Sequence, residues 1–242
     1  MEQKIDRVSF SRNQLKLLIA VTMVADHIGY MLIPPLKGTS GAAAYPLIYY
    51  ILRLAGRLAF PLVCFFLVQG MRYTHDRRKY VLRMFLFALL SEIPFDLAVY
   101  GRLIDWRGQN VLFTLTIGLC VLDLLEKAGK SRTLEGRTVV SFLAVVGGIL
   151  LTCLMRTDYS CWGILFLLVF YLESLHKRQR FWMMLVLCAC QDVIELFAVA
   201  SLFFTEHYDP GKGRGKPWLG RYFFYLFYPL HFLILFGVAA SL

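Results

Sequence analysis

The chain has 242 residues, of which 58% are hydrophobic and 17% are charged. Its mean hydropathy of +0.60 is far above that of soluble domains, so the composition excludes an ordinary water-soluble enzyme and predicts an integral membrane protein. The formal net charge of +10 can indicate nucleic-acid binding. Here the lysines and arginines form short clusters between apolar runs, which makes them topology signals, and no nucleic-acid partner is expected.

Apolar runs of membrane-spanning length divide the chain, since a spanning helix needs about 20 apolar residues. We predict an all-α, polytopic transmembrane helical bundle of about eight spans, with residues 1–242 forming a single integral membrane domain. The fourth to sixth runs are short, so one of them could be tilted or re-entrant. The predicted spans are residues 15–35, 44–70, 80–100, 110–126, 138–155, 160–176, 181–204 and 219–241.

The lysines and arginines in the loops predict how the bundle is oriented, because cytoplasmic loops are enriched in both. Sixteen lie in the segment through Lys16 and in the loops after the second, fourth and sixth spans, whereas eight lie in the other loops. We therefore expect the first side, and with it both termini, to be cytoplasmic. Half of the eight oppose this rule as one cluster in the last outer loop, which suggests a function for Lys212, Arg214, Lys216 and Arg221.

Ionisable residues at membrane depth are informative, because each costs at least about 2.5 kcal/mol on insertion scales and usually faces protein or water. The first span places Asp26 beside His27 in "MVADHIGYML". The second carries Arg53 and Arg57, one turn apart and therefore on one helix face. Other polar residues in or beside the spans are Glu92, Asp96, Asn110, Thr114, Asp158, Tyr159, Asp192, Glu195, Tyr225, Tyr228 and His231.

Some of these residues have a purely structural explanation. Arg53 and Arg57 could neutralise Glu92 and Asp96 as buried ion pairs, which would account for four charges without any chemistry. A lone histidine on an apolar helix, such as His231, is more often a hydrogen-bonded core residue than a catalyst.

His27 is harder to explain by structure alone. It lies about 12 residues into its helix, which at about 1.5 Å per residue is about 18 Å from the cytoplasmic end and near the membrane midplane. Arg57 and His231 lie at a similar depth in their own spans. The three spans could therefore meet in one polar cavity, where a histidine is the natural proton acceptor.

The cysteines predict no chemistry of their own. All six lie in or at the edges of apolar spans and form no CxxC pair, so they are expected to behave as small apolar residues. No metal site is expected.

An ordered set of stretches carries a family resemblance. They are "LKLLIAVTMVADHIGYML", "RLAGRLAFPLVCFFLVQG", "YVLRMFLFALLSEIPFDL", "QNVLFTLTIG", "DYSCWGIL" and "FFYLFYPLHFLIL". Over about residues 15–235 they resemble the TraX family of bacterial membrane proteins. That family takes its name from a conjugation protein required to N-acetylate pilin, and it is similar in organisation to the multi-spanning membrane acyltransferases.

The resemblance implies transfer of an acetyl or short acyl group from cytoplasmic acyl-CoA, with acetyl-CoA as the donor substrate and no metal. The acceptor would be an amine or hydroxyl of a peptide, glycan or lipid at the membrane or its outer face. A multi-pass location in the bacterial cytoplasmic membrane, among membrane lipids, is also implied. The family blocks fall on Asp26, His27, Arg53, Arg57, Ser91, Glu92, Asp96, Gln109, Asn110, Thr114, Asp158, Tyr159, Tyr225, Tyr228 and His231.

Acyl transfer would use the polar residues of the first two spans as follows. His27 removes the proton from the attacking amine or hydroxyl, and His231 competes with it for that role. Asp26 pairs with Arg53 or Arg57 and so holds an arginine where it stabilises the oxyanion or a CoA phosphate.

Other residues would assist. Asn110 is a second candidate donor to the oxyanion, and the basic loop "HDRRK" at residues 75–79 could bind the CoA phosphates. Direct transfer and a transient acyl-histidine both stay open, because no serine or cysteine sits in a nucleophile motif. The predicted substrate-binding and cofactor-binding residues are Arg53, Glu92, Asp96, Thr114, Asp158, Tyr159, Lys216, Tyr225 and Tyr228.

Two other function classes fit the same residues. A proton-coupled transporter could use Glu92, Asp96, Asp192 and Glu195 as a relay, because midplane carboxylates on broken helices suit such proteins. Asp192 and Glu195 have no cation nearby in the sequence and could line a water-filled cavity. A non-enzymatic scaffold in a membrane complex would need only that the polar groups be paired.

Overall fold

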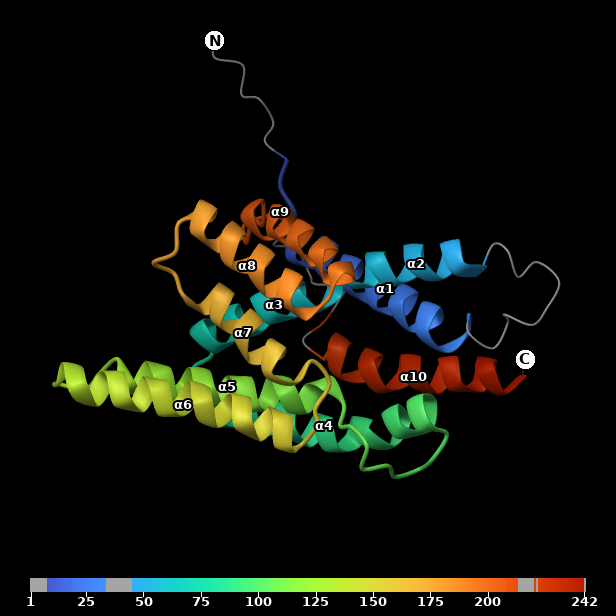
Figure 1. The fold of residues 1–242 in the computed structure, drawn as a ribbon, viewed down its shortest axis with the longest axis horizontal. Helices are drawn as coiled ribbons and strands as arrows, with labels where there is room; N and C mark the ends of the chain where they lie inside the picture. The colour runs from blue at the N-terminus through green and yellow to red at the C-terminus, as the bar shows by residue number, and fades with distance from the viewer. Residues whose placement is uncertain (1–7, 34–44, 213–219, 221, 242) are drawn as a thin grey trace, which may run out of the picture.

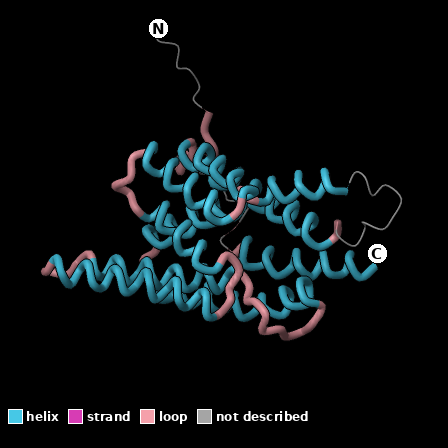
Figure 2. The backbone as a smooth tube through the Cα atoms, in the orientation of Figure 1, coloured by secondary structure: helices cyan, strands magenta, loops and turns pink. Residues whose placement is uncertain are grey.

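The computed structural model describes residues 8–33, 45–212, 220 and 222–241, and every regular element within them is a helix (Figures 1 and 2). The all-helical prediction is therefore confirmed for the described residues. In chain order the elements are α1 (Arg12–Met31), α2 (Tyr45–Gly56), α3 (Ala59–Tyr73), α4 (Arg77–Tyr100), α5 (Val111–Ala128), α6 (Leu134–Leu154), α7 (Ser160–Tyr171), α8 (Lys177–Gln191), the 3₁₀ helix η2 (Val193–Ala200), α9 (Ser201–Glu206) and α10 (Phe223–Ser241).

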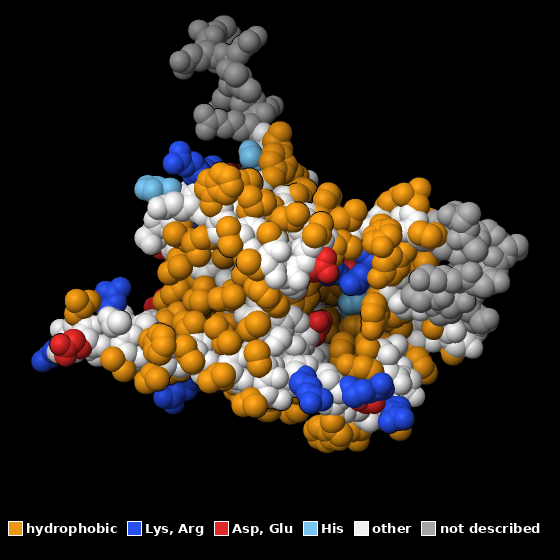
Figure 3. Space-filling model, viewed as in Figure 1, with side chains coloured by type: hydrophobic (Ala, Val, Ile, Leu, Met, Phe, Trp, Pro, Cys, Tyr) orange, Lys and Arg blue, Asp and Glu red, His pale blue; other side chains and the backbone are white. Residues whose placement is uncertain are grey.

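The helix surfaces suit a membrane. Three described helical segments, Pro46–Tyr73, Leu134–Leu154 and Phe223–Ser241, are long and apolar enough to cross one. Exposed leucine, isoleucine, valine and phenylalanine side chains line α4 and α6, and hydrophobic side chains cover most of the face in Figure 3. Such a surface is costly in water and favourable against lipid.

The second predicted span consists of two helices rather than one. Helix α2 ends at Gly56, and α3 begins at Ala59, so Arg57 lies at the break. Helix α2 packs closely against α1, because a side chain at position 56 would collide with Asp26. Glycine is therefore required there by the close approach of the two helices.

The seventh predicted span, residues 181–204, is wrong. Helix α8 ends at Gln191, and Asp192 then caps η2 by accepting a hydrogen bond from the backbone N–H of Ile194. The chain returns through η2 and α9, and Lys177 at the start of α8 lies 3.1 Å from Glu206 at the end of α9. Residues 177–206 therefore form a helical hairpin that enters and leaves at one end of the bundle.

The hairpin reverses the direction of α10. Phe87 and Phe95 of α4 contact Tyr225 and Phe232 of α10, with ring centroids 4.3 and 5.5 Å apart, so the two helices are parallel. Lys16 near the start of α1 contacts Gly220, and His27 further along α1 contacts His231 of α10, so α1 and α10 are also parallel. The C-terminal helix therefore ends at the end of the bundle away from the start of α1, and the prediction that both termini lie on one side is wrong (Figure 1).

We call the end where α1 begins the basic end. It holds the loops at residues 74–76, 129–133 and 172–176, each of which is flanked by a cluster of lysines and arginines. Lys212 also lies there, because its Nζ donates to the Ser9 carbonyl oxygen at 2.6 Å. Lys212 was predicted to lie on the other side with Arg214, Lys216 and Arg221, which fall outside the described residues. For Lys212, the apparent exception to the charge rule disappears.

The apolar core lies mainly between α3, α4, α5 and α7. Leu115, Leu119, Phe166 and Leu167 are almost completely buried there. Helix α10 packs against α4 and α1, and α1 packs against α2 and α3. Asp26, His27, Arg53 and Arg57 lie on α1, on α2 and at the end of α2, whereas Glu92 lies on α4, and Asn110 and Thr114 lie at the start of α5. The fold therefore places the polar groups inside the bundle, where they face protein or a cavity.

Candidate functional site

A cavity of about 820 Å³ lies between α1, α3, α4, α5 and α10. Its wall carries Arg12, Lys16 and Arg83 at the basic end, and Tyr30 and Tyr100 at the opposite end. Lys16 and Tyr30 are 14 residues apart on α1, so the cavity is about 21 Å long at about 1.5 Å per residue. A hollow on the face shown in Figure 3 exposes acidic, basic and histidine side chains among the hydrophobic surface.

Two histidines meet in the middle of this length. His27 Nδ1 lies 2.8 Å from His231 Nε2, and His231 Nδ1 lies 3.0 Å from the carbonyl oxygen of Phe227. A carbonyl can only accept, so His231 Nδ1 donates to it, and neutral His231 then accepts at Nε2 from the Nδ1–H of His27. This hydrogen-bond chain leaves the lone pair of neutral His27 on Nε2.

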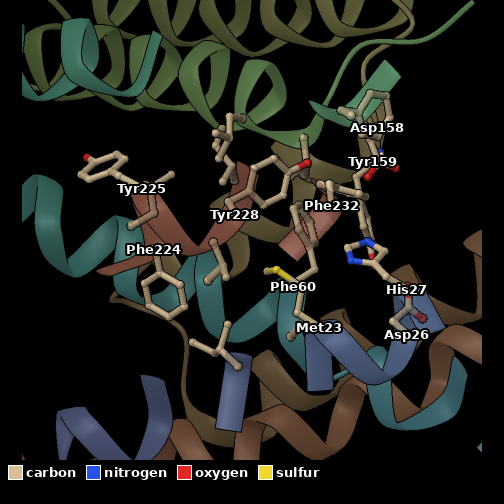
Figure 4. A pocket seen from close by; sticks show the side chains of 18 of the residues that line it. Met23, Asp26, His27, Phe60, Asp158, Tyr159, Phe224, Tyr225, Tyr228 and Phe232 are labelled. Atoms are coloured by element: carbon tan, nitrogen blue, oxygen red, sulfur yellow. Dashed lines mark hydrogen bonds between the residues drawn. The ribbon is translucent and has the colours of Figure 1, made fainter. Parts of the chain in front are cut away.

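The two histidines have different surroundings. His231 is 4% exposed and does not line the cavity, which agrees with its predicted place as a hydrogen-bonded core residue. His27 lines the cavity, where Figure 4 shows its ring beside Tyr159 and Phe232. Among the described residues, no hydrogen-bond partner occupies its Nε2. His27 therefore offers a proton acceptor to the cavity, and His231 orients it.

Asp26 stands beside His27 and belongs to a separate cluster of four charges. Arg53 Nη1 lies 2.7 Å from its carboxylate, and Arg57 pairs with the other carboxylate oxygen. Arg57 also pairs with Glu195 from the hairpin, and its Nε donates to the Arg53 carbonyl oxygen at 3.1 Å. The predicted pairing of Asp26 with the arginines is confirmed, and two carboxylates balance two guanidinium groups.

This cluster changes the expected role of Arg57. Each of its three guanidinium nitrogens already bonds to Asp26, Glu195 or a backbone carbonyl, and its side chain is 8% exposed. Arg53 makes one ion pair, is more exposed at 19%, and lines the cavity over the Tyr30 ring. Of the two arginines, Arg53 has the donors to spare for a bound molecule.

Glu92 and Asp96 do not pair with Arg53 and Arg57, so that structural interpretation is wrong. Glu92 accepts hydrogen bonds from the backbone and side chain of Asn110, and Asp96 accepts the backbone N–H of Asp105 at 2.8 Å. Both carboxylates hold the loop at residues 101–110 against α4. Neither lines the cavity.

Asn110 and Thr114 also serve the fold rather than the cavity. The Asn110 side chain accepts from the Leu112 N–H as the cap of α5 and donates to the Ala88 carbonyl oxygen at 2.8 Å. The hydroxyl of Thr114 bonds to Thr157 at 2.7 Å and to the Asp158 carbonyl. Both residues are fully buried, and neither lines the cavity. The predicted oxyanion role of Asn110 and the predicted binding role of Thr114 find no support in this geometry.

The loop between α6 and α7 brings Asp158 and Tyr159 into the cavity wall. Its backbone is strained, since Tyr159 has φ +59° and its neighbours Arg156 and Ser160 are also in the left-handed region. The Tyr159 ring stacks on Phe60 with centroids 3.7 Å apart. One Asp158 carboxylate oxygen accepts the Tyr159 N–H at 2.9 Å, and no ion pair with a described cation neutralises that carboxylate.

At the basic end the cavity is lined by residues that the sequence analysis did not single out. Arg12 and Lys16 are one turn apart on α1, and Arg83 and Tyr80 face them from α4. The sequence shows that Arg12 and Lys16 are one turn apart, but cations at the start of a span predict topology and do not by themselves indicate a binding site. Of the predicted residues, Tyr225 and Tyr228 do line the cavity, and Figure 4 shows Tyr225 on the far side from His27 and Tyr228 between them, beside Phe232.

The predicted phosphate loop at residues 75–79 lies outside this cavity, in a shallow pocket of its own. Arg77 pairs with Glu126 at 3.3 Å, and Lys79 pairs with Asp76 at 3.2 Å. The charge of this loop is therefore partly neutralised within the chain.

Comparisons with known proteins agree with this arrangement of motifs. The family profile described as TraX protein matches residues 11–239. A probable fimbrial assembly protein FimC, serogroup H1, from Dichelobacter nodosus is 26% identical over 253 aligned residues, which cover 94% of this chain and 95% of that protein. No solved structure matches the chain. The family match spans both the cavity and the histidine pair, and the chain belongs to the TraX family.

Proposed function

We propose that the protein is a membrane-embedded acyltransferase. It moves an acetyl or short acyl group from cytoplasmic acyl-CoA to an amine or hydroxyl of an acceptor at the membrane or its outer face. The observation that carries the proposal is a single cavity that joins a cationic mouth at the basic end to the unoccupied Nε2 of His27 near its middle.

The cationic mouth suits the donor. Arg12, Lys16 and Arg83 present positive charge where a nucleotide bearing several phosphates would bind. Lys16 and His27 are 11 residues apart on α1, or about 16 Å at about 1.5 Å per residue. An extended pantetheine arm reaches over a distance of this kind, so phosphates at the mouth would place the thioester beside His27.

The chemistry then follows from the histidine pair. His27 Nε2 takes the proton of the attacking amine or hydroxyl, whose lone pair forms the new bond to the thioester carbonyl carbon. Arg53 stabilises the resulting oxyanion. The carbon–sulfur bond then breaks, and the departing CoA thiolate takes the proton that His27 removed from the acceptor. The positive charge on His27 during this cycle is stabilised by its Nδ1–H bond to His231.

The acceptor side is lined by a different set of charges. Asp158 faces the cavity with a carboxylate that forms no ion pair with a described cation, and this carboxylate can accept a hydrogen bond from the N–H of a neutral amine acceptor. The name of the Dichelobacter relative refers to fimbrial assembly, and it favours a peptide of a surface fibre as the acceptor over a glycan or a lipid.

The orientation belongs to the same proposal. With the basic end in the cytoplasm of a bacterial cell, the hairpin at residues 177–206 enters and leaves on the cytoplasmic side, and α10 ends outside. The donor then enters from the cytoplasm, and the acceptor reaches the cavity from the membrane or the outer face.

The transporter alternative is less well supported. Its relay would consist of Glu92, Asp96, Asp192 and Glu195, and these four residues do not line the cavity. All four already bond within the protein: Asp96 and Asp192 to backbone N–H groups, Glu92 to Asn110, and Glu195 to Arg57.

The test uses purified protein in lipid nanodiscs with isotopically labelled acetyl-CoA. Membrane-protein, glycan and lipid extracts are added in separate reactions, and the label is followed by mass spectrometry. We expect CoA binding and label transfer to one extract. A folded protein that neither binds CoA nor transfers label to any extract would contradict the proposal.

A further inference from the structure

The loop at residues 101–110 presents three large apolar side chains outward. Leu103 is 63% exposed, Ile104 is 66% exposed and Trp106 is 81% exposed. A loop in water normally carries polar residues at such positions, and three exposed apolar side chains in four residues need an apolar neighbour.

The loop is fixed, so this exposure is a property of the fold. The Asp105 side chain points inward and is 4% exposed, while its backbone N–H donates to Asp96 at 2.8 Å. Arg107 donates to both Asp105 carboxylate oxygens at 2.9 and 2.8 Å, and these bonds lower the pKa of Asp105 to about 2. The Arg107 guanidinium also lies 4.5 Å over the Tyr100 ring. With Asp105 held inward, Ile104 and Trp106 on either side of it project outward.

The exposed side chains continue an apolar surface. Along α4 the exposed residues Leu86, Leu90 and Ile93 lead toward the loop at the end of that helix. The loop itself adds two exposed arginines, Arg102 and Arg107, beside its apolar side chains. Tryptophan together with cations at the end of an apolar helix surface is the composition of a membrane–water interface.

The same loop borders the cavity. Tyr100 comes directly before the loop, and Gly108 and Gln109 lie near its end. All three line the cavity at the end opposite the basic end. Backbone bonds between Gln109 and the loop at residues 155–159 join this border to Asp158. Whatever fixes the position of the loop therefore also fixes the position of the cavity mouth.

We propose that the loop at residues 101–110 is a membrane-interface anchor, with Leu103, Ile104 and Trp106 inserted between the lipid headgroups and the upper acyl chains of the outer leaflet. The partner is the lipid bilayer itself. The anchor holds the outer mouth of the cavity at headgroup level, so that an acceptor attached to the membrane reaches the cavity along the membrane plane. The choice of the outer leaflet and this last clause rest on the proposed function and its orientation, whereas the insertion of the loop into a membrane interface does not.

The experiment measures the depth of Trp106 directly. Trp162, Trp182 and Trp218 are replaced by Phe, and the protein is reconstituted in phosphatidylcholine vesicles whose acyl chains carry bromine either near the headgroup or near the chain end. We expect stronger quenching of Trp106 fluorescence by the bromines near the headgroup, and weak quenching by aqueous iodide. As a matched control, a variant without Trp106 carries Ser131→Trp in the exposed loop at the basic end, and we expect iodide to quench it strongly.

Two outcomes would overturn the anchor. Strong quenching of Trp106 by iodide without quenching by either brominated lipid would place the loop in water. A Trp106 emission that changes with the protein-to-lipid ratio would show that a second copy covers the loop. Thermal unfolding of the same variants in detergent reports whether they are folded. Because neither CoA binding nor acyl transfer is measured, failure of the anchor is distinct from failure of the enzyme.

Discussion

The pair of His27 and His231 can be compared with the hydrogen bonds by which Glu92, Asp96 and Asn110 hold the 101–110 loop. Both are polar groups among apolar helices, but they differ in whether an atom without a hydrogen-bond partner faces the cavity. The side-chain amide and carbonyl of Asn110 both form hydrogen bonds within the protein, and Asn110 does not line the cavity. His27 uses only its Nδ1 in a hydrogen bond within the protein, so its Nε2 is available to a molecule in the cavity. Glu92 and Asp96 also keep an unbonded oxygen, but neither lines the cavity. Polar residues at membrane depth therefore indicate function only when an unbonded atom also faces the cavity.

The largest expected effect is at His27. His27→Gln removes the proton acceptor, and we expect acetyl transfer to fall by about 10²- to 10⁴-fold, while CoA affinity stays unchanged. Isothermal titration with CoA and single-turnover transfer kinetics separate the two quantities. Transfer at the original rate would show that the chemistry does not need this histidine.

A substitution at Glu195 tests whether the buried charge cluster of Asp26, Arg53, Arg57 and Glu195 stabilises the fold. Glu195→Gln leaves the buried Arg57 with an unbalanced charge, which should destabilise the protein by about 3–5 kcal/mol. Thermal unfolding in detergent measures the loss. The matched control is Glu173→Gln, since the Arg72–Glu173 pair has a carboxylate that is 72% exposed and should contribute about 0–1 kcal/mol. Equal losses in both variants would contradict the buried cluster.

His231 is a positioning residue and should have an intermediate effect. His231→Leu removes the acceptor for the His27 Nδ1–H, and we expect transfer to fall by about 10²-fold and its pH profile to shift. His231→Gln can still accept through its amide oxygen, so it should restore part of the rate. If Leu and Gln behave alike, the hydrogen bond does not orient His27.

The cationic mouth should affect only the donor. Arg12→Gln combined with Arg83→Gln removes two charges from the cavity wall, and we expect CoA affinity to fall about tenfold or more. Arg78→Gln in the 75–79 loop is the control, because that loop lies outside the cavity, and it should leave the affinity unchanged. The reverse result would move the donor site to the 75–79 loop.

Asn110 should have the smallest effect on activity, because it acts on stability alone. Asn110→Ala removes the cap of α5 and the side-chain hydrogen bonds to Glu92 and the Ala88 carbonyl oxygen, which together should cost about 1–3 kcal/mol. The transfer rate per folded molecule should not change, because Asn110 lies outside the cavity wall. A loss of rate in fully folded protein would restore its predicted role at the oxyanion.

Most helix positions could be predicted from the apolar runs, because the length of a run limits where a helix in lipid can begin and end. The hairpin at residues 177–206 could not, since its apolar composition equals that of a single span. Gln191, Asp192 and Glu195 in the middle of that run were the available signal, because Asp192 is a good helix cap. Missing this turn also produced the wrong side for the C-terminus.

The candidate site could be predicted in part for a similar reason. The pairing of Asp26 with the arginines follows from the cost of burying any of them alone. The partner of Arg57 across 138 residues, Glu195, follows only from the three-dimensional fold. That Arg12 and Arg83 meet at the basic end also follows only from the three-dimensional fold. In the sequence, cations at loops and helix ends indicate topology first.

The central claim is that one cavity joins the donor mouth to His27. The most direct test is a cryo-electron microscopy structure of the protein in nanodiscs with a non-transferable acetyl-CoA analogue. The account predicts phosphate density beside Arg12, Lys16 and Arg83, and an acetyl group within hydrogen-bond reach of His27 Nε2. An analogue bound at the 75–79 loop with its acetyl group outside the cavity, or a cavity closed between Arg83 and His27, would contradict it.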